Sequence, residues 1–490
     1  MQKVIIIVTL GIGILCSCSK DFLEKYPISS QSTGAFFKTE SDFEQATNAI
    51  YDGLDKVYTP LKSHSVILGS RCDEFTRGDG ESFWINNFTD DATQTHYQEM
   101  WQKEFNAIFR SNILLSKSQG ISTDEIPKIE RFRAEARFLR GMFYFDLVRT
   151  FGGMPLYDGN LSLDEYYSIP RSSIKETYNF IIDDFRAAAE DLPAEYEGND
   201  IGRATSWAAK GFLAKVLLYM EKYEECLYLC NEIINSGKFQ FLPVWVDIFN
   251  EDNDNGPQAL FQIQYISGGD GEGNQMPGLY MDPTAKTFAG RTFSTRGAAG
   301  YPRVSSRFYN SFDTSDVRRD FSIIRNFLDL NGNPQTGSFV GKFTVGAYDA
   351  FDFLNWGINH TLLRFTEILL MKAECINELS GPTAEAVEIV DQIRDRAGLP
   401  ALTDLEKANK QSFFDALVRE RAHELAFEDN RWFDLVRWGI AEKVINEYLG
   451  EQYPDFNYKM ESYHVLFPIP HQEIENIGDE SVLWQNPGYN

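Results

Sequence analysis

The sequence has few residues of the kinds that hold metal ions or form disulfides. It contains 6 Cys and 6 His among 490 residues. No Cys-x-x-Cys pair occurs, and the histidines show neither His-x-x-x-His nor His-Glu-x-x-His spacing, so we expect no metal site and no cofactor. Cys226 and Cys230 are four positions apart, which places both on one helix face. We expect them to pack as small apolar side chains.

The chain is also short of positive charge. It has 46 Lys and Arg against 72 Asp and Glu, a net charge of −26, and no tract of five or more basic residues. Such a charge repels phosphate backbones, so nucleic acid is excluded as a partner, and anionic membrane surfaces do not attract it. The composition is 43% hydrophobic, which excludes disorder as a description of the whole chain.

Long hydrophobic runs are missing except at the N-terminus. Val4 to Leu15 is too short for the roughly 20 residues of a membrane-spanning helix, but it suits the apolar region of a signal peptide. The run ends in Leu15-Cys16-Ser17-Cys18, the order of a bacterial lipobox. Ordinary cleavage nearby is the alternative, but a polar Ser19-Lys20-Asp21 follows at once. We therefore expect a signal peptide at 1–17, a lipid on Cys18 and a tether at 18–40.

The period of the apolar residues is mainly helical. Apolar side chains recur every three to four positions, and Ser41 and Ser173 each precede a Glu by three residues, as in a capping box. Gly152, Gly153 and Pro155 end the clearest of these segments. The predicted helices are 41–56, 98–117, 129–150 and 173–191.

Further helices are predicted in pairs. The segment Lys222 to Leu227 has the residue order of the turn and second-helix start in a tetratricopeptide repeat, with Cys226 at the small position where two helices approach. A second pair covers 362–379 and 383–397, and a last helical block covers 412–438. The expected fold is all-α or mainly α, a tetratricopeptide-like scaffold of helix-turn-helix pairs at about 41–249 and 360–440.

Two stretches lack this period. Residues 250–359 are rich in Gly, Asn and Asp with scattered aromatics, and residues 71–97 have the same character. Long irregular insertions in compact folds are usually functional or disordered, and the aromatic residues argue against disorder. We expect 250–359 to be a loop-rich, ligand-binding excursion from the scaffold within a single domain, 41–490.

Several ordered motifs resemble one known family. The segment 132–155, FRAEARFLRGMFYFDLVRTFGGMP, is similar to the signature helix of the SusD/RagB outer-membrane lipoproteins. Further blocks agree, and the resemblance runs from the lipobox to the last residues. These blocks are 170–173 (PRSS), 202–205 (GRAT), 394–400 (RDRAGLP), 419–435 (RERAHELAFEDNRWFDL), 466–470 (LFPIP) and 485–488 (QNPG).

This resemblance implies a surface lipoprotein of a Gram-negative outer membrane. Such a protein binds an oligosaccharide or polysaccharide and delivers it to a partner, a SusC-like TonB-dependent transporter. Capture of peptides on the same scaffold, as in the RagB branch, keeps the fold and changes only the ligand. A lipid-anchored glycoside hydrolase is a second alternative, for which two carboxylates about 5–10 Å apart would suffice.

No pair of acidic residues stands out as catalytic. Glu420, Glu424 and Glu428 recur every four residues on one predicted helix. We expect them to be solvated, or paired with Arg419, Arg421 and Arg431 in a framework network. The protein is therefore expected to be a binding protein and not an enzyme.

Glycan binding needs a flat aromatic face and polar groups that bond pairs of hydroxyls. Trp84 and Tyr280 are large aromatics in the two polar segments, and Asp73, Arg77 and Asn87 can bond hydroxyls. We expect these five residues to contact the ligand. Arg296 and Tyr301 are further candidates, whereas Phe88 and Trp101 are expected to lie in the core.

Overall fold

The computed structural model describes most of the chain after its N-terminal segment. The described residues are 36–58, 64–76, 80–159, 161–268, 272–282, 284–288, 291–292, 303–344 and 355–489. Cys18, Arg77, Arg296 and Tyr301 lie outside these ranges, as does the predicted signal peptide. Within them, no helix is long and apolar enough to span a membrane.

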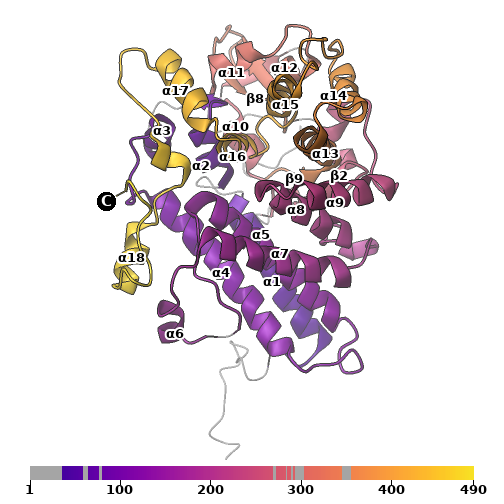
Figure 1. Ribbon diagram of the computed structural model, residues 1–490, viewed down its shortest axis with the longest axis vertical. Helices are drawn as coiled ribbons and strands as arrows, with labels where there is room; N and C mark the ends of the chain where they lie inside the picture. Colours follow the sequence, from indigo (N-terminus) through magenta and orange to yellow (C-terminus); the bar gives the residue numbers. More distant parts are fainter. Residues whose placement is uncertain are drawn as a thin grey trace, which may run out of the picture.

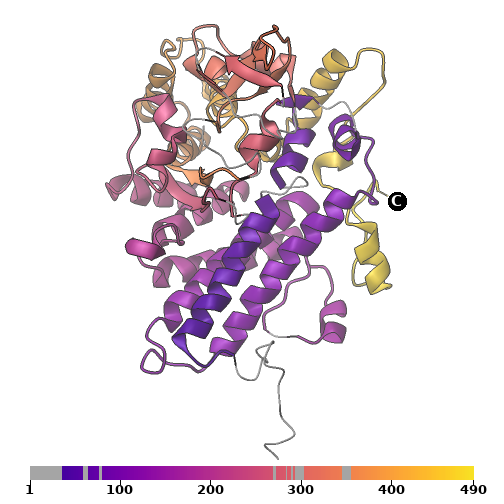
Figure 2. The same cartoon turned by 180° about the vertical axis from the view of Figure 1, so that it is seen from behind.

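The fold is mainly helical, as predicted. Long N-terminal helices lie side by side in the lower half of the molecule (Figures 1 and 2). α5 is buried on nearly all sides because its own apolar side chains are spread around the whole helix. Gly152, with a φ of 86°, ends the helix. These helices are α1 (Glu40–Tyr58), α4 (Thr95–Ser118), α5 (Ile129–Phe151) and α7 (Ile174–Asp191).

The two predicted capping boxes have different outcomes. The Ser173 hydroxyl accepts the Glu176 N–H and the Glu176 carboxylate accepts the Ser173 N–H, so this box is confirmed. The box at Ser41 is wrong, because Thr39 occupies the cap position. Its hydroxyl accepts the Asp42 N–H at 3.2 Å, and Asp42 accepts the Thr39 N–H at 2.9 Å. Asp42 therefore has the capping role that we predicted for Glu44.

Tetratricopeptide-like helix pairs continue the scaffold. Cys226 and Cys230 are buried where α9 packs on α13, with their sulfurs 4.0 Å apart, and Cys375 of α13 is buried as well. Their predicted role in packing is confirmed. The helices of these pairs are α8 (Ser206–Tyr219), α9 (Tyr223–Asn235), α13 (Phe365–Ser380) and α14 (Ala384–Arg396).

The C-terminal helical block is interrupted. Phe427 and Asp429 have positive φ angles of 65° and 60°, so the chain turns between α15 and α16. The C-terminal helices are α15 (Lys410–Glu424), α16 (Arg431–Arg437), α17 (Ala441–Gln452) and α18 (His471–Ile477). In Figure 1, α17 lies next to α3, and α18 lies below them on the same side of the molecule.

Short strands gather above the helical layer (Figures 1 and 2). Every strand pair is antiparallel, and the described sheets have two or three strands. The pairs are β1 (Phe75–Thr76) with β5 (Arg303–Val304), β2 (Ala259–Ile263) with β9 (His360–Arg364), β6 (Ile323–Arg325) with β8 (Ser338–Val340), and β3 (Ala285–Phe288) with both β4 (Arg291–Thr292) and β7 (Leu328–Asp329).

Short helices complete the fold. One of them, α3, overturns the irregular structure that we expected for residues 71–97. The remaining helices are α2 (His64–Arg71), α3 (Gly80–Asn87), α6 (Leu163–Tyr167), α10 (Met276–Tyr280), α11 (Ser306–Ser311) and α12 (Val317–Ser322), with 3₁₀ turns at Gly198–Asp200, Trp245–Phe249, Glu251–Asn253 and Ser462–Val465.

A buried charge network joins the stranded region to the helices. Glu424 of α15 accepts hydrogen bonds from Arg364 at 2.8 Å, Arg396 at 2.6 Å and Arg318 at 3.1 Å. Burial favours the neutral form, but the three guanidinium groups outweigh it and hold the pKa of Glu424 below its ordinary value. The expected partners were wrong, because these arginines come from distant segments.

The neighbouring acidic residues belong to the same network. Glu420 pairs with Arg318 and Arg394, and Glu428 pairs with Arg364 and Lys342. The three arginines that we expected as partners bind other carboxylates. Arg419 pairs with Glu406, Arg421 with Asp434, and Arg431 with Asp73. A framework role for the three glutamates is confirmed.

Candidate ligand-binding surface

Asp73 lies in the turn that leads from α2 into β1. Its two carboxylate oxygens accept hydrogen bonds from Arg431 Nε at 2.8 Å and Nη2 at 2.9 Å. Burial disfavours the charge on Arg431, but Asp73 outweighs it and raises the pKa of Arg431 above its ordinary value. Asp73 therefore fixes the start of α16 against this turn, and its carboxylate is committed to a buried, bidentate pair.

Asn87 ends α3 and is buried. Its side-chain oxygen accepts hydrogen bonds from the backbone N–H and the hydroxyl of Thr89 at 3.2 and 2.6 Å. Its neighbour Asn86 donates to the Ser70 and Phe75 carbonyls and accepts from the hydroxyls of Tyr448 and Tyr453. Asn86 therefore holds α3 against α2 and the end of α17, whereas Asn87 bonds the turn that follows α3.

Tyr280 lies in the core of the stranded region. Its side chain is 1% exposed, and its ring stacks on Phe75 with centroids 5.6 Å apart and planes 9° apart. Phe343 covers it at 6.1 Å. The ring has no open face for a sugar, so the expected platform of Trp84 and Tyr280 is not present. The sequence reasoning failed here because the aromatic cluster that buries Tyr280 is drawn from three separate segments.

Among the expected ligand-contact residues that the structure describes, Trp84 lies on the surface. It lies in the middle of α3 with 46% of its side chain exposed. The preceding residue, Phe83, packs edge-on against Tyr453 and Tyr458, each with a centroid distance of 6.1 Å. A helix held by the buried Asn86 and by Phe83 therefore presents a large flat ring to solvent.

The segment after α17 adds aromatic surface that the sequence reasoning missed. Phe456 is 62% exposed and stacks on Tyr458 with centroids 5.1 Å apart and planes 4° apart. Tyr458 and Tyr453 meet edge-on at 5.4 Å. The signal in the sequence was three aromatics within six residues of a polar loop, but the pairing of this loop with α3 depends on tertiary structure. We call Phe83, Trp84, Tyr453, Phe456 and Tyr458 the α3 aromatic surface.

A buried acid lies behind this surface. Glu74 accepts the Phe427 N–H at 3.0 Å and lies beside the Cys72 thiol. Burial raises the pKa of Glu74 to about 8. It therefore acts as a structural link between β1 and the turn after α15. In the described residues, no group of three His, Cys, Asp or Glu side chains could hold a metal ion.

The arrangement suits stacking on a flat ligand. Exposed aromatic faces can bind the C–H face of a sugar ring. Two acidic side chains near α3, Asp73 and Glu74, are bonded inside the fold. Phe88 and Trp101 are buried, as predicted, and take no part in the surface.

Two family profiles together match most of the chain. The sequence profile of the SusD family matches residues 237–489. A second profile, described as starch-binding and associating with the outer membrane, matches residues 21–218. SusD-like protein P25 of Formosa agariphila is 26% identical over 520 residues, which cover 97% of this chain and 97% of that protein.

Solved structures share the fold. A laminarin-binding SusD-like protein superposes with a TM-score of 0.75 and 25% identity, covering 92% of this chain and all of that one. Surface glycan-binding protein A of Bacteroides thetaiotaomicron, in complex with laminarihexaose, superposes with a TM-score of 0.77 and 21% identity, covering 91% and 99% of the two chains.

Proposed function

Because this chain belongs to the SusD family, as its motifs predicted, we propose that it is a glycan-binding lipoprotein of the Gram-negative cell surface. It binds an oligosaccharide or polysaccharide and delivers it to a SusC-like TonB-dependent transporter in the outer membrane. The observation that supports this most directly is an exposed Trp84 on a rigidly held helix, in a chain whose relatives include laminarin- and glycan-binding proteins.

The α3 aromatic surface is the proposed contact with the ligand. Trp84 stacks on a sugar ring, and Phe456, which is also exposed, offers a further ring for stacking. Arg77, in the segment before α3, supplies hydrogen-bond donors to hydroxyl groups. Asp73, Asn87 and Tyr280 support this surface from inside the fold, through Arg431, Thr89 and Phe75 respectively.

The burial and ion pairing of three central glutamates fit binding without catalysis. A glycosidase needs an acid and a base that both reach the substrate. Glu420, Glu424 and Glu428 are instead buried in ion pairs with arginine and lysine. Their low exposure and paired charges suit a scaffold.

The proposed anchor and domain division come from the sequence. Residues 1–17 act as the signal peptide, Cys18 carries the lipid, residues 18–40 form the tether and 41–490 form one domain. With a net charge of −26, the protein is held at the membrane by acyl chains and not by attraction to anionic lipids.

A binding screen tests the proposed function. The purified protein is titrated with plant, microbial and host polysaccharides, with their oligosaccharides and with peptides, and the release of reducing ends is followed in parallel. We expect saturable binding of a glycan class and no hydrolysis. Binding of peptides alone would assign the chain to peptide capture, and reducing-end release that one carboxylate substitution abolishes would make it a hydrolase.

A further inference from the structure

A cavity lies on the other side of the molecule from α3 (Figures 1 and 2). It has a volume of about 420 Å³, within the range of roughly 300–1,000 Å³ of small-molecule sites. Three segments form it: the loop between α7 and α8 with the first turn of α8, the segment after α9, and the turn into β2. In Figures 1 and 2, α8, α9 and β2 lie on the side opposite α3.

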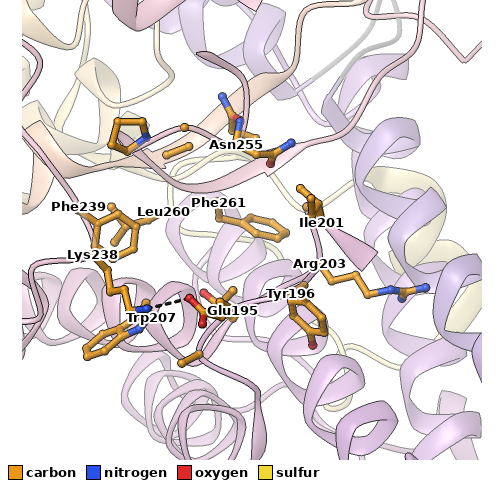
Figure 3. Close-up of a pocket in the computed structure, with 17 residues that line it drawn as sticks. Glu195, Tyr196, Ile201, Arg203, Trp207, Lys238, Phe239, Asn255, Leu260 and Phe261 are labelled. Carbon is orange, nitrogen blue, oxygen red and sulfur yellow. Dashed lines mark hydrogen bonds and ion pairs between the residues drawn. The ribbon is translucent and has the colours of Figure 1, made fainter. Parts of the chain in front are cut away.

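The cavity wall combines aromatic rings with polar groups. Phe261 of β2 is buried and forms the floor, while Tyr196, Trp207 and Phe239 are partly buried around it (Figure 3). Among the described residues, the Trp207 indole nitrogen and the Tyr196 hydroxyl are covered by protein but have no hydrogen-bond partner. Such orphaned groups are rare because they lose their bonds to water. Because these two atoms are covered, the rings offer their apolar faces to a ligand, and the exposed Lys238 and Glu195 supply polar groups that its hydroxyls can reach.

One ion pair crosses the cavity. Lys238 Nζ lies 2.8 Å from Glu195 Oε2, and the two side chains are 47% and 71% exposed (Figure 3). Exposed pairs of this kind contribute little to stability, about 0–1 kcal/mol. The pair can therefore open, and its remaining carboxylate oxygen and ammonium hydrogens can bond hydroxyl groups of a ligand.

The opposite wall is fixed. The guanidinium of Arg203 points away from the cavity (Figure 3) and bonds Asp200 at 2.7 Å and Glu135 at 3.0 Å. Thr205 caps α8 by accepting the Ala208 N–H at 3.1 Å. These two residues of the 202–205 motif hold the loop in place and leave its apolar side, including the exposed Ile201, facing the cavity.

From this wall we propose a second saccharide site, which holds about one or two pyranose rings against Trp207, Phe239 and Phe261. The site rests on the proposed glycan-binding function and deepens it. A polysaccharide that engages both the α3 aromatic surface and this cavity gains avidity, because the second contact is intramolecular. A long chain is then retained better than a short one.

Fluorine NMR of the full chain gives separate signals for Trp84 in the α3 aromatic surface and for Trp207 in the cavity. The protein is labelled with 5-fluorotryptophan, and Trp84→Phe, Trp207→Phe and Trp484→Phe variants assign three of the eight tryptophans. The probes are laminarihexaose, maltohexaose, xylohexaose, mannohexaose and a random hexapeptide pool. Trp484 is 43% exposed, similar to Trp84, and serves as the reference ring.

We expect a hexasaccharide to shift Trp207 in a saturable way and to leave Trp484 unchanged. A shift of Trp84 alone would overturn the second site and keep the proposed function. A shift of Trp207 alone would support the second site and reject the α3 aromatic surface. No shift of either ring with any saccharide would reject both. A Trp207 shift with the peptide pool and with no saccharide would overturn the saccharide assignment.

A variant that fills the cavity with a larger side chain distinguishes ligand binding in the cavity from a remote effect on the Trp207 signal. Ala194 is exposed and lines the cavity, and Ala194→Phe adds a ring there without removing a framework bond. Ala401→Phe makes the same change at an exposed position elsewhere. We expect Ala194→Phe to weaken the Trp207 titration more than tenfold, with the Trp84 titration and both titrations of Ala401→Phe unchanged. An unaltered Trp207 titration in Ala194→Phe would overturn the site.

Discussion

At the scale of single residues, exposure separates side chains that look alike in the sequence. Trp84 and Tyr280 are both aromatic and both lie in polar segments, yet Trp84 is 46% exposed and Tyr280 is 1% exposed. The difference arises because Tyr280 faces Phe75 and Phe343, whereas the ring of Trp84 projects from a short surface helix. Composition supplies the candidates, but tertiary packing decides which of them can contact a ligand.

Glu74→Gln should remove a pH dependence of stability. Burial raises the pKa of Glu74 to about 8 from a usual value of 4.5, so between these values the folded state keeps a proton that the unfolded chain releases. Its contribution is fully present below about pH 4.5 and is lost as the pH rises through 8, at about 1.4 kcal/mol per pH unit. Urea unfolding from pH 5 to 9 should give a flatter profile for Glu74→Gln than for wild type.

Glu442→Gln is the control for this series, because Glu442 is exposed. Its profile should follow wild type. The interpretation of Glu74 fails if Glu74→Gln and wild type lose stability with pH at the same rate.

Cys226→Ala should be mild and Cys226→Leu worse. Cys226 is fully buried in the contact between α9 and α13, with its sulfur 4.0 Å from that of Cys230, so a larger side chain is expected to overpack the site. Overpacking of such a site costs about 1–3 kcal/mol. The two variants are compared by thermal and urea unfolding, and the reverse order of stability would contradict the close helix packing.

At the scale of elements, one carboxylate holds several segments together. Glu424 of α15 bonds arginines of α12, α14 and the end of β9. Glu424→Gln should cost about 3–5 kcal/mol, because it leaves buried guanidinium groups without their counter-charge. Urea unfolding measures the loss.

Glu385, which pairs with Lys372 and is 61% exposed, provides the control, and Glu385→Gln should change stability by less than about 1 kcal/mol. Equal effects of the two variants would rule out the framework role.

The helices were largely predictable and the short elements were not. The predicted 129–150 is α5, Ile129–Phe151, because a long apolar period that ends at two glycines leaves few alternatives. α3 was missed because an eight-residue helix of mixed composition carries no clear period. The break between α15 and α16 was missed because Phe427, a bulky residue that rarely adopts positive φ, does so here, followed by Asp429.

The candidate site was predicted only in part. Trp84 was found from its type and its neighbours in the sequence. Tyr453, Phe456 and Tyr458 were missed because they lie far along the chain and reach α3 only in the folded protein. The arginine partners of Glu424 were missed for the same reason, since ion pairs between distant segments leave no local pattern.

At the scale of the whole molecule, charge and anchoring are separate properties. The net charge of −26 gives no attraction to an anionic membrane, and no described helix can span one. Cys18→Ala should therefore abolish acylation and release the protein from the membrane fraction. Cell fractionation in a strain without the partner transporter checks this, and continued membrane retention there would contradict the proposed anchor.

The measurement that tests glycan binding at the α3 aromatic surface most directly is a calorimetric titration of wild type, Trp84→Ala and Trp484→Ala with the glycan found in the screen. Trp84→Ala should weaken binding more than tenfold, about 1.4 kcal/mol, with little change in melting temperature. Trp484→Ala, at a ring of similar exposure, should bind as wild type does. Wild-type affinity in Trp84→Ala would contradict the proposed site.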